Sequence, residues 1–199
     1  MVAGHFIRLA QSLALAYASG ISPYATVTLV GLMQRAGWIG PLPGALGVLA
    51  NPVLLTVCGA LAVIEFAATL LPGVAAAWDS VHTVVRPLAA VALAIATAWH
   101  ADPTIVALAG ILGGGLAFAT HATKLGLRIA VDTSPEPVTN AVMNVTEVSI
   151  IATVSYFVWN HPIATLTLAL LLLVVTMLLV RLAWRLLKQV LTFRPRVSP

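Results

Sequence analysis

Long runs of apolar residues dominate the chain, and short clusters of proline, glycine and charged residues separate them. Each run approaches or exceeds the roughly 20 residues that an α-helix needs to cross a bilayer. The strands of a membrane β-barrel would instead alternate apolar and polar residues over about ten positions. The pattern therefore predicts an all-α, polytopic transmembrane helical bundle of about six spans, at residues 6–33, 53–71, 80–99, 103–123, 138–159 and 162–187.

Composition supports this class of protein. Of 199 residues, 60% are apolar and only 8% are charged, whereas about a quarter of the residues of an ordinary soluble domain are charged. The predicted spans leave only short loops, so we expect residues 1–199 to form a single transmembrane domain. All five tryptophans stand at or just beyond the ends of the predicted spans, where an indole ring can lie among the lipid headgroups.

The formal net charge is +4, and the basic residues are scattered except for one group at the end of the last apolar run and just after it: Arg181, Arg185, Lys188, Arg194 and Arg196. Such a group is typical of a cytoplasmic membrane flank attracted to anionic lipid. We therefore expect membrane lipids rather than nucleic acid as partners, and a basic cytoplasmic tail at 181–199. Six spans would place both termini on the cytoplasmic side of a bacterial inner (plasma) membrane.

The first apolar run contains an interruption at residues 19–24, where a glycine, a proline and two serines occur together. Three interpretations stay open. The segment could be a plain proline kink, satisfied by a serine hydroxyl. It could be a broken helix of the kind that builds binding sites in transporters. It could also be a re-entrant hairpin, which would change the number of spans by one.

Six spans also allow an inverted repeat of three helices and three helices. In the first half, Gly20 interrupts the first apolar run, and in the second half Gly113, Gly114 and Gly115 would do the same. Glu65 and Glu147 each lie in the middle of the second run of their half. The glycines have a simpler interpretation as well. Gly110 and Gly114 form a GxxxG pair, which lets helices approach closely and could support a homo-oligomer.

An ion pair is predicted between the second and third spans. Glu65 lies about seven residues before the end of its span, and Arg86 lies about seven residues after the start of the next. In an antiparallel hairpin the two side chains would be level, roughly 10 Å deep at 1.5 Å per residue. An unpaired charge at that depth costs at least a few kcal/mol. We expect Glu65 and Arg86 to pair, either as a functional site or only to fix the packing of the helices.

A second polar group is predicted where the fourth and fifth spans approach the cytoplasm. Spacing of three and four places His121, Lys124 and Arg128 on one helix face, and Asn140, Asn144 and Glu147 on another. The two faces could meet in a polar cleft that is open to the cytoplasm, and Glu147 and His121 could pass a proton there. The alternatives are that Lys124 and Arg128 extend to the membrane surface and that His121 is a packing residue.

The remaining polar positions suggest no further site. Asp79 and Ser80 are predicted to cap the third span. His5, His100 and His161 fall at span ends without the spacing of metal ligands, and Cys58 is the single cysteine. The sequence contains no HExxH, GxSxG or nucleotide-binding motif. We therefore predict no metal, no cofactor and no catalytic residue, and an enzyme is the less favoured class.

Several short motifs of polar residues lie at residues 20–24, 65–68, 78–87, 121–128 and 134–147. Together they resemble an uncharacterised bacterial membrane family, known as domain of unknown function 4126, and the resemblance covers about residues 9–158. It implies a small integral membrane protein without an established activity. The chain departs from the family pattern at Thr69, Leu70, Ala75 and Val148, where the family pattern has charged residues, which argues against an acidic relay common to the family.

The sequence supports three functional hypotheses. The leading one is a transporter or channel for a small polar or anionic solute, with a site open to the cytoplasm. The second is a membrane-embedded enzyme or lipid-handling protein that uses His121 and Glu147 as acid and base. The third is a structural subunit of a membrane complex. For the first, the predicted substrate-binding or translocation residues are Ser22, Tyr24, Glu65, Arg86, His121, Lys124, Asn140, Asn144 and Glu147.

Overall fold

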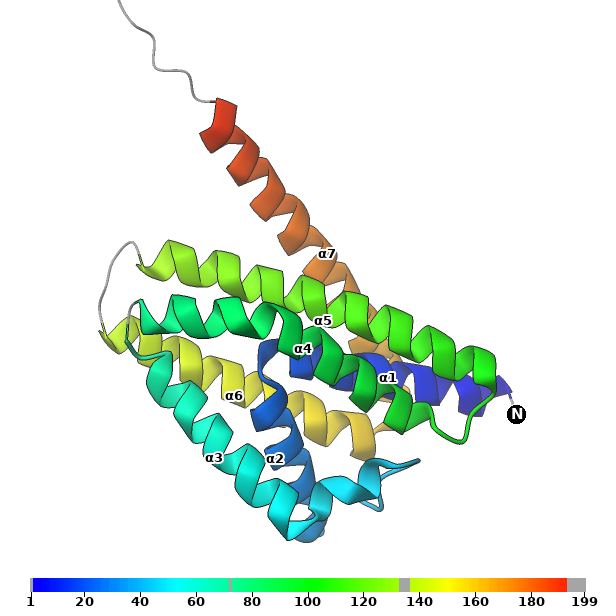
Figure 1. Cartoon of the computed structure of the whole chain (residues 1–199). Helices are drawn as coiled ribbons and strands as arrows, with labels where there is room; N and C mark the ends of the chain where they lie inside the picture. Colours follow the sequence, from blue (N-terminus) through cyan, green and yellow to red (C-terminus); the bar gives the residue numbers. More distant parts are fainter. Residues whose placement is uncertain (1, 72, 133–136, 193–199) are drawn as a thin grey trace, which may run out of the picture.

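The computed structural model describes residues 2–71, 73–132 and 137–192, and over these ranges all of its regular secondary structure is helical (Figure 1). The elements are α1 Val2–Ile21, α2 Pro23–Arg35, the 3-10 helix η1 Leu46–Ala50, α3 Pro52–Ala68, α4 Val74–Ala98, α5 Pro103–Asp132, α6 Pro137–Asn160 and α7 Pro162–Thr192. The predicted all-α bundle is confirmed.

Proline marks the start of most helices. Helices α2, α3, α5, α6 and α7 all begin at a proline, where the missing N–H would have had no partner within the helix. Side chains cap several of these starts. The carboxamide oxygen of Asn51 accepts hydrogen bonds from the backbone N–H groups of Val53 and Leu54, and the carboxylate of Asp102 accepts one from Thr104 at 2.8 Å. The local sequence thus specifies where the helices begin.

The first predicted span is divided into two helices at Ser22. Helix α1 runs inward from the N-terminus, and α2 leaves it at a sharp angle (Figure 1). The segment after α2 returns to the end of the bundle from which α1 came. There the Ala45 N–H donates to the carbonyl of Ala96, and the Asn160 side chain donates to the carbonyl of Trp38. Of the three interpretations of the interruption, the re-entrant hairpin is therefore the one that α1 and α2 adopt.

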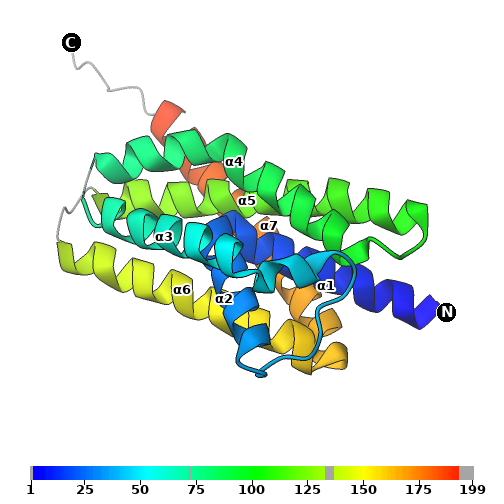
Figure 2. The same ribbon diagram turned by 60° about the horizontal axis from the view of Figure 1, so that its bottom comes forward.

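This hairpin changes the predicted topology. We call the end that carries the N-terminus and the α4–α5 and α6–α7 connections the N-terminal end, and the other the opposite end. Helix α7 starts at the N-terminal end and runs in the direction of α5, so its last described residues lie toward the opposite end (Figure 2). Helices α1 and α2 together therefore do not run from one end of the bundle to the other. The expectation that both termini lie on the cytoplasmic side stays a prediction.

Three helices within the described residues are long and apolar enough to span a membrane, namely Ala77–Ala98, Pro103–Arg128 and Val138–Asn160. Two apolar segments are shorter, Pro52–Ala68 and Ile163–Val175. Large apolar side chains such as Val81, Val84 and Leu88 are exposed on the outside of the bundle, whereas several charged side chains, among them Asp79, Arg86 and Arg128, are buried inside it. This distribution is costly in water and suits a lipid environment, so the structure is that of a membrane protein.

Helix α5 is continuous through its glycines, so the interruption that the inverted repeat required is absent. The glycines instead allow helices of the same chain to touch. A Cβ atom on Gly113 would lie 2.9 Å from the Cβ of Ala94, and one on Gly114 would lie 2.6 Å from a methyl group of Val91. Gly110 faces Ile95, which belongs to α4 like Ala94 and Val91. The GxxxG pair therefore packs against α4 of the same chain.

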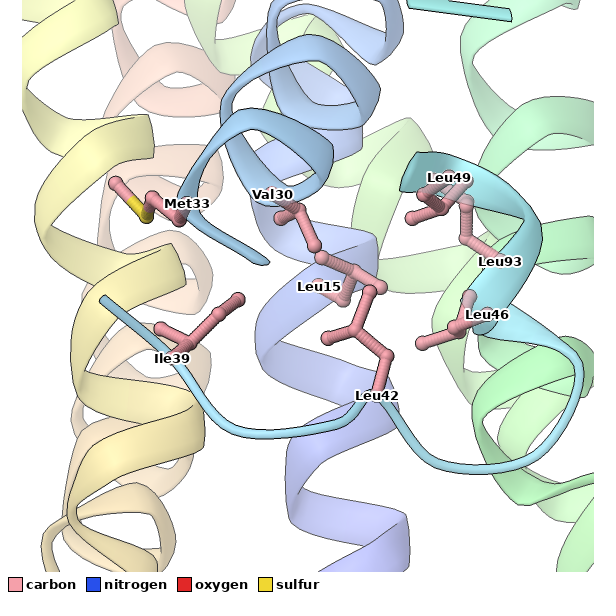
Figure 3. Packing of buried hydrophobic residues seen from close by; sticks show 8 residues of the cluster. All are labelled: Leu15, Val30, Met33, Ile39, Leu42, Leu46, Leu49 and Leu93. Atoms are coloured by element: carbon pink, nitrogen blue, oxygen red, sulfur yellow. The ribbon is translucent and has the colours of Figure 1, made fainter. Parts of the chain in front are cut away.

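An apolar core closes the N-terminal end. Figure 3 shows side chains from α1, α2, the segment after α2, η1 and α4 meeting around the base of the hairpin. The cluster consists of Leu15, Val30, Met33, Ile39, Leu42, Leu46, Leu49 and Leu93. Backbones also approach one another here, because Gly31 lies against the carbonyl of Leu49 and Gly44 against that of Ala96. This packing holds the hairpin in place and directs its tip, at Ser22, into the bundle.

Candidate functional site

Six charged side chains meet around the tip of the hairpin, and we call them the charged cluster. They come from four helices: Glu65 from α3, Asp79 and Arg86 from α4, Lys124 and Arg128 from α5, and Glu147 from α6. Three carboxylates face three cations, so the formal charges of the cluster sum to zero. Neutrality is what a low-dielectric interior requires, since an uncompensated ion is far more costly there than a pair.

Arg86 is completely buried and connects two carboxylates. Its Nη2 lies 2.7 Å from Oε1 of Glu65 and 2.8 Å from Oδ1 of Asp79. The predicted Glu65–Arg86 pair is therefore present. The second carboxylate was not predicted: Asp79 was assigned as a helix cap, but α4 begins at Val74, and the Asp79 side chain points into the bundle with no exposed surface.

Arg128 is also buried and joins three helices. Its Nε lies 3.2 Å from Oδ2 of Asp79, and its Nη1 donates to the carbonyl of Thr69 at 2.9 Å. Its Nη2 donates to the side chain of Asn144 at 3.2 Å. The alternative in which Arg128 extends to the membrane surface is wrong, because the planar guanidinium has several fixed donors that the partners in the bundle can satisfy together.

Lys124 lies between the two glutamates. Its Nζ is 2.8 Å from Oε2 of Glu147 and 3.9 Å from Oε1 of Glu65. The same ammonium donates to the carbonyl of Ile21 at 3.1 Å. Ile21 is the last residue of α1, where a carbonyl has no partner within its helix. The Ile21 carbonyl that the break between α1 and α2 leaves without a helical partner therefore accepts a hydrogen bond from the buried Lys124 ammonium.

Ser22 has two roles at the break. Its Oγ accepts a hydrogen bond from the N–H of Ala25 and so caps α2. Its hydroxyl proton is donated to Oε2 of Glu65 in a short hydrogen bond. A residue at this position must accept on one side and donate on the other, which a hydroxyl can do. Ser22 therefore fixes the tip of the hairpin to the charged cluster.

His121 is held in one protonation state by its neighbours. Its Nδ1 makes a short hydrogen bond with Nη1 of Arg86, and its Nε2 lies 3.0 Å from Oγ1 of Thr83. Because a guanidinium can only donate, Nδ1 must be the acceptor and the ring is neutral, with its proton on Nε2. The hydroxyl of Thr83 then donates onward to the carbonyl of Asp79 at 3.1 Å.

Tyr24 reaches the edge of the cluster through a second histidine. The Tyr24 hydroxyl lies 3.1 Å from Nε2 of His82, whose Nδ1 lies 2.7 Å from the carbonyl of Trp78. The indole of Trp78 stacks on the His82 ring with the centroids 4.5 Å apart. His82 was not among the predicted site residues, although its spacing of three from Asp79 and four from Arg86 places all three on one face of α4.

The two predicted asparagines are both buried, but they differ in their contacts. Asn144 accepts from Arg128 and donates to the carbonyl of Phe66 at 3.0 Å, so it links α6 to α3 and α5. No hydrogen bond within the described residues joins Asn140 to the charged cluster. Of the nine residues predicted for the site, eight therefore lie in this network or at its edge. Asn140 is buried four residues before Asn144 on α6.

Two cavities reach the charged cluster, one on each side of α6. Cavity 1, of about 450 Å³, lies between α2, α3 and α6. Cavity 2, of about 320 Å³, lies between α1, α5 and α6. Glu147 lines both, and its side chain is 17% exposed whereas the other charged side chains of the cluster are 6% exposed or less. Most of the remaining lining is aliphatic.

Metal ions find no obvious ligands. The described residues contain no group of three or more His, Cys, Asp or Glu side chains that could hold one. The carboxylates of the cluster are instead neutralised by arginine and lysine, which occupy the positions that a cation would need. What the arrangement offers chemically is a set of paired ions beside two apolar cavities.

The fold and the cluster together define a helical membrane protein with a neutral, buried ionic network at the tip of a re-entrant hairpin. A family model described as a domain of unknown function, DUF4126, matches residues 9–182. The chain therefore belongs to this family. Searches of curated proteins and of solved structures return no match.

Proposed function

We propose that the protein is a carrier for amphipathic solutes, which it binds in cavity 1. The observation that carries the proposal is the composition of the cavity: aliphatic walls from α2, α3 and α6 lead to a polar end at the charged cluster. The polar end is formed by Ser22, Glu65, Thr69, Asn144 and Glu147. Pockets that are apolar with a few placed polar groups are typical of sites for small organic ligands.

The size of cavity 1 supports this class of ligand. About 450 Å³ is within the range of roughly 300–1,000 Å³ that is usual for small-molecule sites. Its walls include Ala25, Gly59 and Ala62, whose small side chains leave room for an alkyl chain. Burying that chain would stabilise the complex by about 0.8 kcal/mol for each CH₂ group if it came from water, and its polar group would select the orientation.

A small anion is a less favoured substrate. That expectation depended on an excess of cations in the site, but Asp79 completes a cluster of three carboxylates and three cations. Each of Arg86, Lys124 and Arg128 already has a carboxylate partner. The remaining hypotheses also lose support. His121 donates and accepts within the bundle and lines neither cavity, so it is a poor acid or base, and the GxxxG surface of the structural hypothesis is used internally.

The test is photolabelling of the protein in lipid nanodiscs with a diazirine-bearing long-chain alcohol, followed by mass spectrometry of the labelled peptides. Saturable labelling of α3 and α6, competed by excess dodecanol, is the expected result. The substitution Ala62→Trp fills cavity 1 and should reduce specific labelling at least tenfold. Ala60→Trp is the matched control, because Ala60 is exposed on the same helix and does not line the cavity. Equal specific labelling of both variants, or labelling that dodecanol does not compete, would overturn the proposal.

The orientation that we propose places the end of α7 in the cytoplasm of a bacterium and the protein in its inner membrane. Exposed basic residues on α7, including Arg181, Arg185 and Lys188, favour that side. Lys124 and Arg128 do not enter this count because they are buried. Reporter fusions after residue 192 test it: a C-terminal fluorescent protein should be active, whereas a C-terminal alkaline phosphatase should not.

A further inference from the structure

We propose that the solute bound in cavity 1 carries a positive charge, that its cation replaces the Lys124 ammonium on Glu147, and that Lys124 releases one proton in exchange. This inference rests on the proposed function and specifies its substrate class: an amphiphile with an alkyl or aryl body and an ammonium head. It also makes the binding event an exchange of one cation for one proton.

The lining of cavity 1 indicates the sign of the ligand charge. Two carboxylates, Glu65 and Glu147, belong to the lining, and none of the described lysines or arginines does. The three cations of the cluster lie behind these carboxylates: Arg86 and Arg128 line neither cavity, and Lys124 lines only cavity 2. A ligand in cavity 1 therefore meets carboxylate oxygens, hydroxyl groups and an amide, which suit a cation or a hydrogen-bond donor.

Glu147 is the carboxylate that a ligand can reach. Its Oε1 is buried without a hydrogen-bond partner among the described residues and lies 3.6 Å from Nη2 of Arg128. Among the described residues, the partner of its Oε2 is Lys124 alone, whose Nζ lies 2.8 Å away. Glu65, by contrast, is held by Arg86, by Ser22 and more distantly by Lys124. Displacing one ammonium group is therefore enough to free Glu147, whereas freeing Glu65 would require several contacts to break.

Charge balance determines the fate of the displaced ammonium. With three carboxylates and three cations the cluster is neutral, and a bound cation would leave one surplus positive charge in a buried site. Arginine does not lose its proton in proteins, but a lysine ammonium does so when its surroundings are apolar. Lys124 is the lysine of the cluster, and it is 6% exposed. The charged and titratable groups that interact with it are Glu65 on α3, Asp79 and Arg86 on α4, His121 on its own helix, and Glu147 on α6, and Arg128 shares Glu147 with it.

The exchange is balanced in atoms and charge. The ammonium of Lys124 leaves Glu147 and becomes an amine by giving up one proton to water. The amine keeps its contact at the carbonyl of Ile21 through a remaining N–H. The cation of the ligand takes its place on Glu147, and the cluster stays neutral. A ligand that brings one charge and expels one proton should bind about tenfold more tightly for each unit that the pH rises.

Competition with the photoreactive alcohol tests the substrate class. Dodecyltrimethylammonium, dodecanol and dodecyl sulfate share one chain length and differ in charge. At pH 8 the cation should compete at a concentration at least tenfold lower than the alcohol, after correction for partition into lipid, and the sulfate should compete worst. The apparent affinity for the cation should rise about tenfold per pH unit, and that for the alcohol should not change. Equal competition by all three compounds would overturn the inference while leaving the proposed function intact.

Two variants separate the steps. Glu147→Gln should remove the preference for the cation, so that dodecyltrimethylammonium competes no better than dodecanol. Lys124→Arg retains a cation opposite Glu147 that cannot be deprotonated, so it should weaken competition by the cation at least tenfold and flatten its pH dependence. Proton release by the unmodified protein is measured independently with an indicator dye in weak buffer. We expect one proton per bound cation and none per bound alcohol, and no release with the cation would refute the exchange.

Discussion

At the N-terminal end of the bundle the backbones of separate segments touch, whereas at the charged cluster long ionic side chains join the helices. Gly31 and Gly44 illustrate the first arrangement, since each lies directly against a carbonyl of another segment. The bonds from Lys124 to Glu147 and from Arg128 to Asn144 illustrate the second. Close apolar packing permits one geometry, but flexible ionic side chains can exchange partners. The difference indicates that one end of the protein is a rigid anchor and the other is where a ligand can be accommodated.

Of the substitutions that test this difference between the two ends, removing Arg86, the central cation, should have the largest effect on stability. Arg86→Met would leave Glu65 and Asp79 buried with an uncompensated charge between them, which costs about 3–5 kcal/mol. We expect the free energy of unfolding in detergent, measured with chemical denaturant, to fall by that amount. The control is Arg35→Met at the N-terminal end, where an exposed arginine donates only to the carbonyl of Ala50. A similar, small loss in both variants would mean that the cluster does not stabilise the fold.

A methyl group at the anchor should have the next largest effect. Gly44 has a φ angle of +61°, and its added Cβ would collide with the carbonyl of Ala96. Strain in the left-handed region costs about 1–3 kcal/mol, and displacing the carbonyl adds to it, so we expect Gly44→Ala to lower the free energy of unfolding by at least about 2 kcal/mol. Gly47→Ala, where a Cβ meets nothing within 4 Å, is the matched control. If both substitutions are tolerated equally, this end is less rigid than the packing indicates.

The smallest effect concerns Asp102, which lies outside the membrane-spanning helices at the start of α5. The hydrogen bond from the Thr104 N–H lowers the pKa of Asp102 below its ordinary value. A lowered pKa in the folded state stabilises the protein above the ordinary pKa of the group, and this contribution is lost as the pH falls through the lowered value. We therefore expect the Tm to fall slightly more between pH 6 and pH 3 in the unmodified protein than in Asp102→Asn, whose amide still caps the helix. Parallel pH dependences would contradict this assignment.

The sequence allowed the helices to be predicted well, because apolar runs and prolines are local signals. Helices α6 and α7, for example, start within one residue of the predicted bounds. The Glu65–Arg86 pair could also be predicted, since the depths of two residues on adjacent antiparallel helices can be counted. Both signals depend on near neighbours in the chain.

The rest depended on contacts between distant segments. Asp79 was assigned as a cap because a charge in an apolar run resembles a helix boundary, and only the position of Arg128 across the bundle shows that it is an interior residue. The sequence around Ser22 left three interpretations open, a kink, a broken helix and a hairpin. What decides between them is the docking of residues 38 and 45 onto α6 and α4, which no local pattern encodes.

The hairpin also constrains the order in which the protein is assembled. Helix α1 is the first to be synthesised, but it packs against α4, α5, α6 and α7. Its Gln11 side chain donates to the carbonyl of Val158, 147 residues further along the chain. Contacts of such long range form late, because the loops that separate the partners must close first. Helix α1 must therefore wait for helices that follow it in the chain, and the hairpin of α1 and α2 completes the bundle rather than starting it.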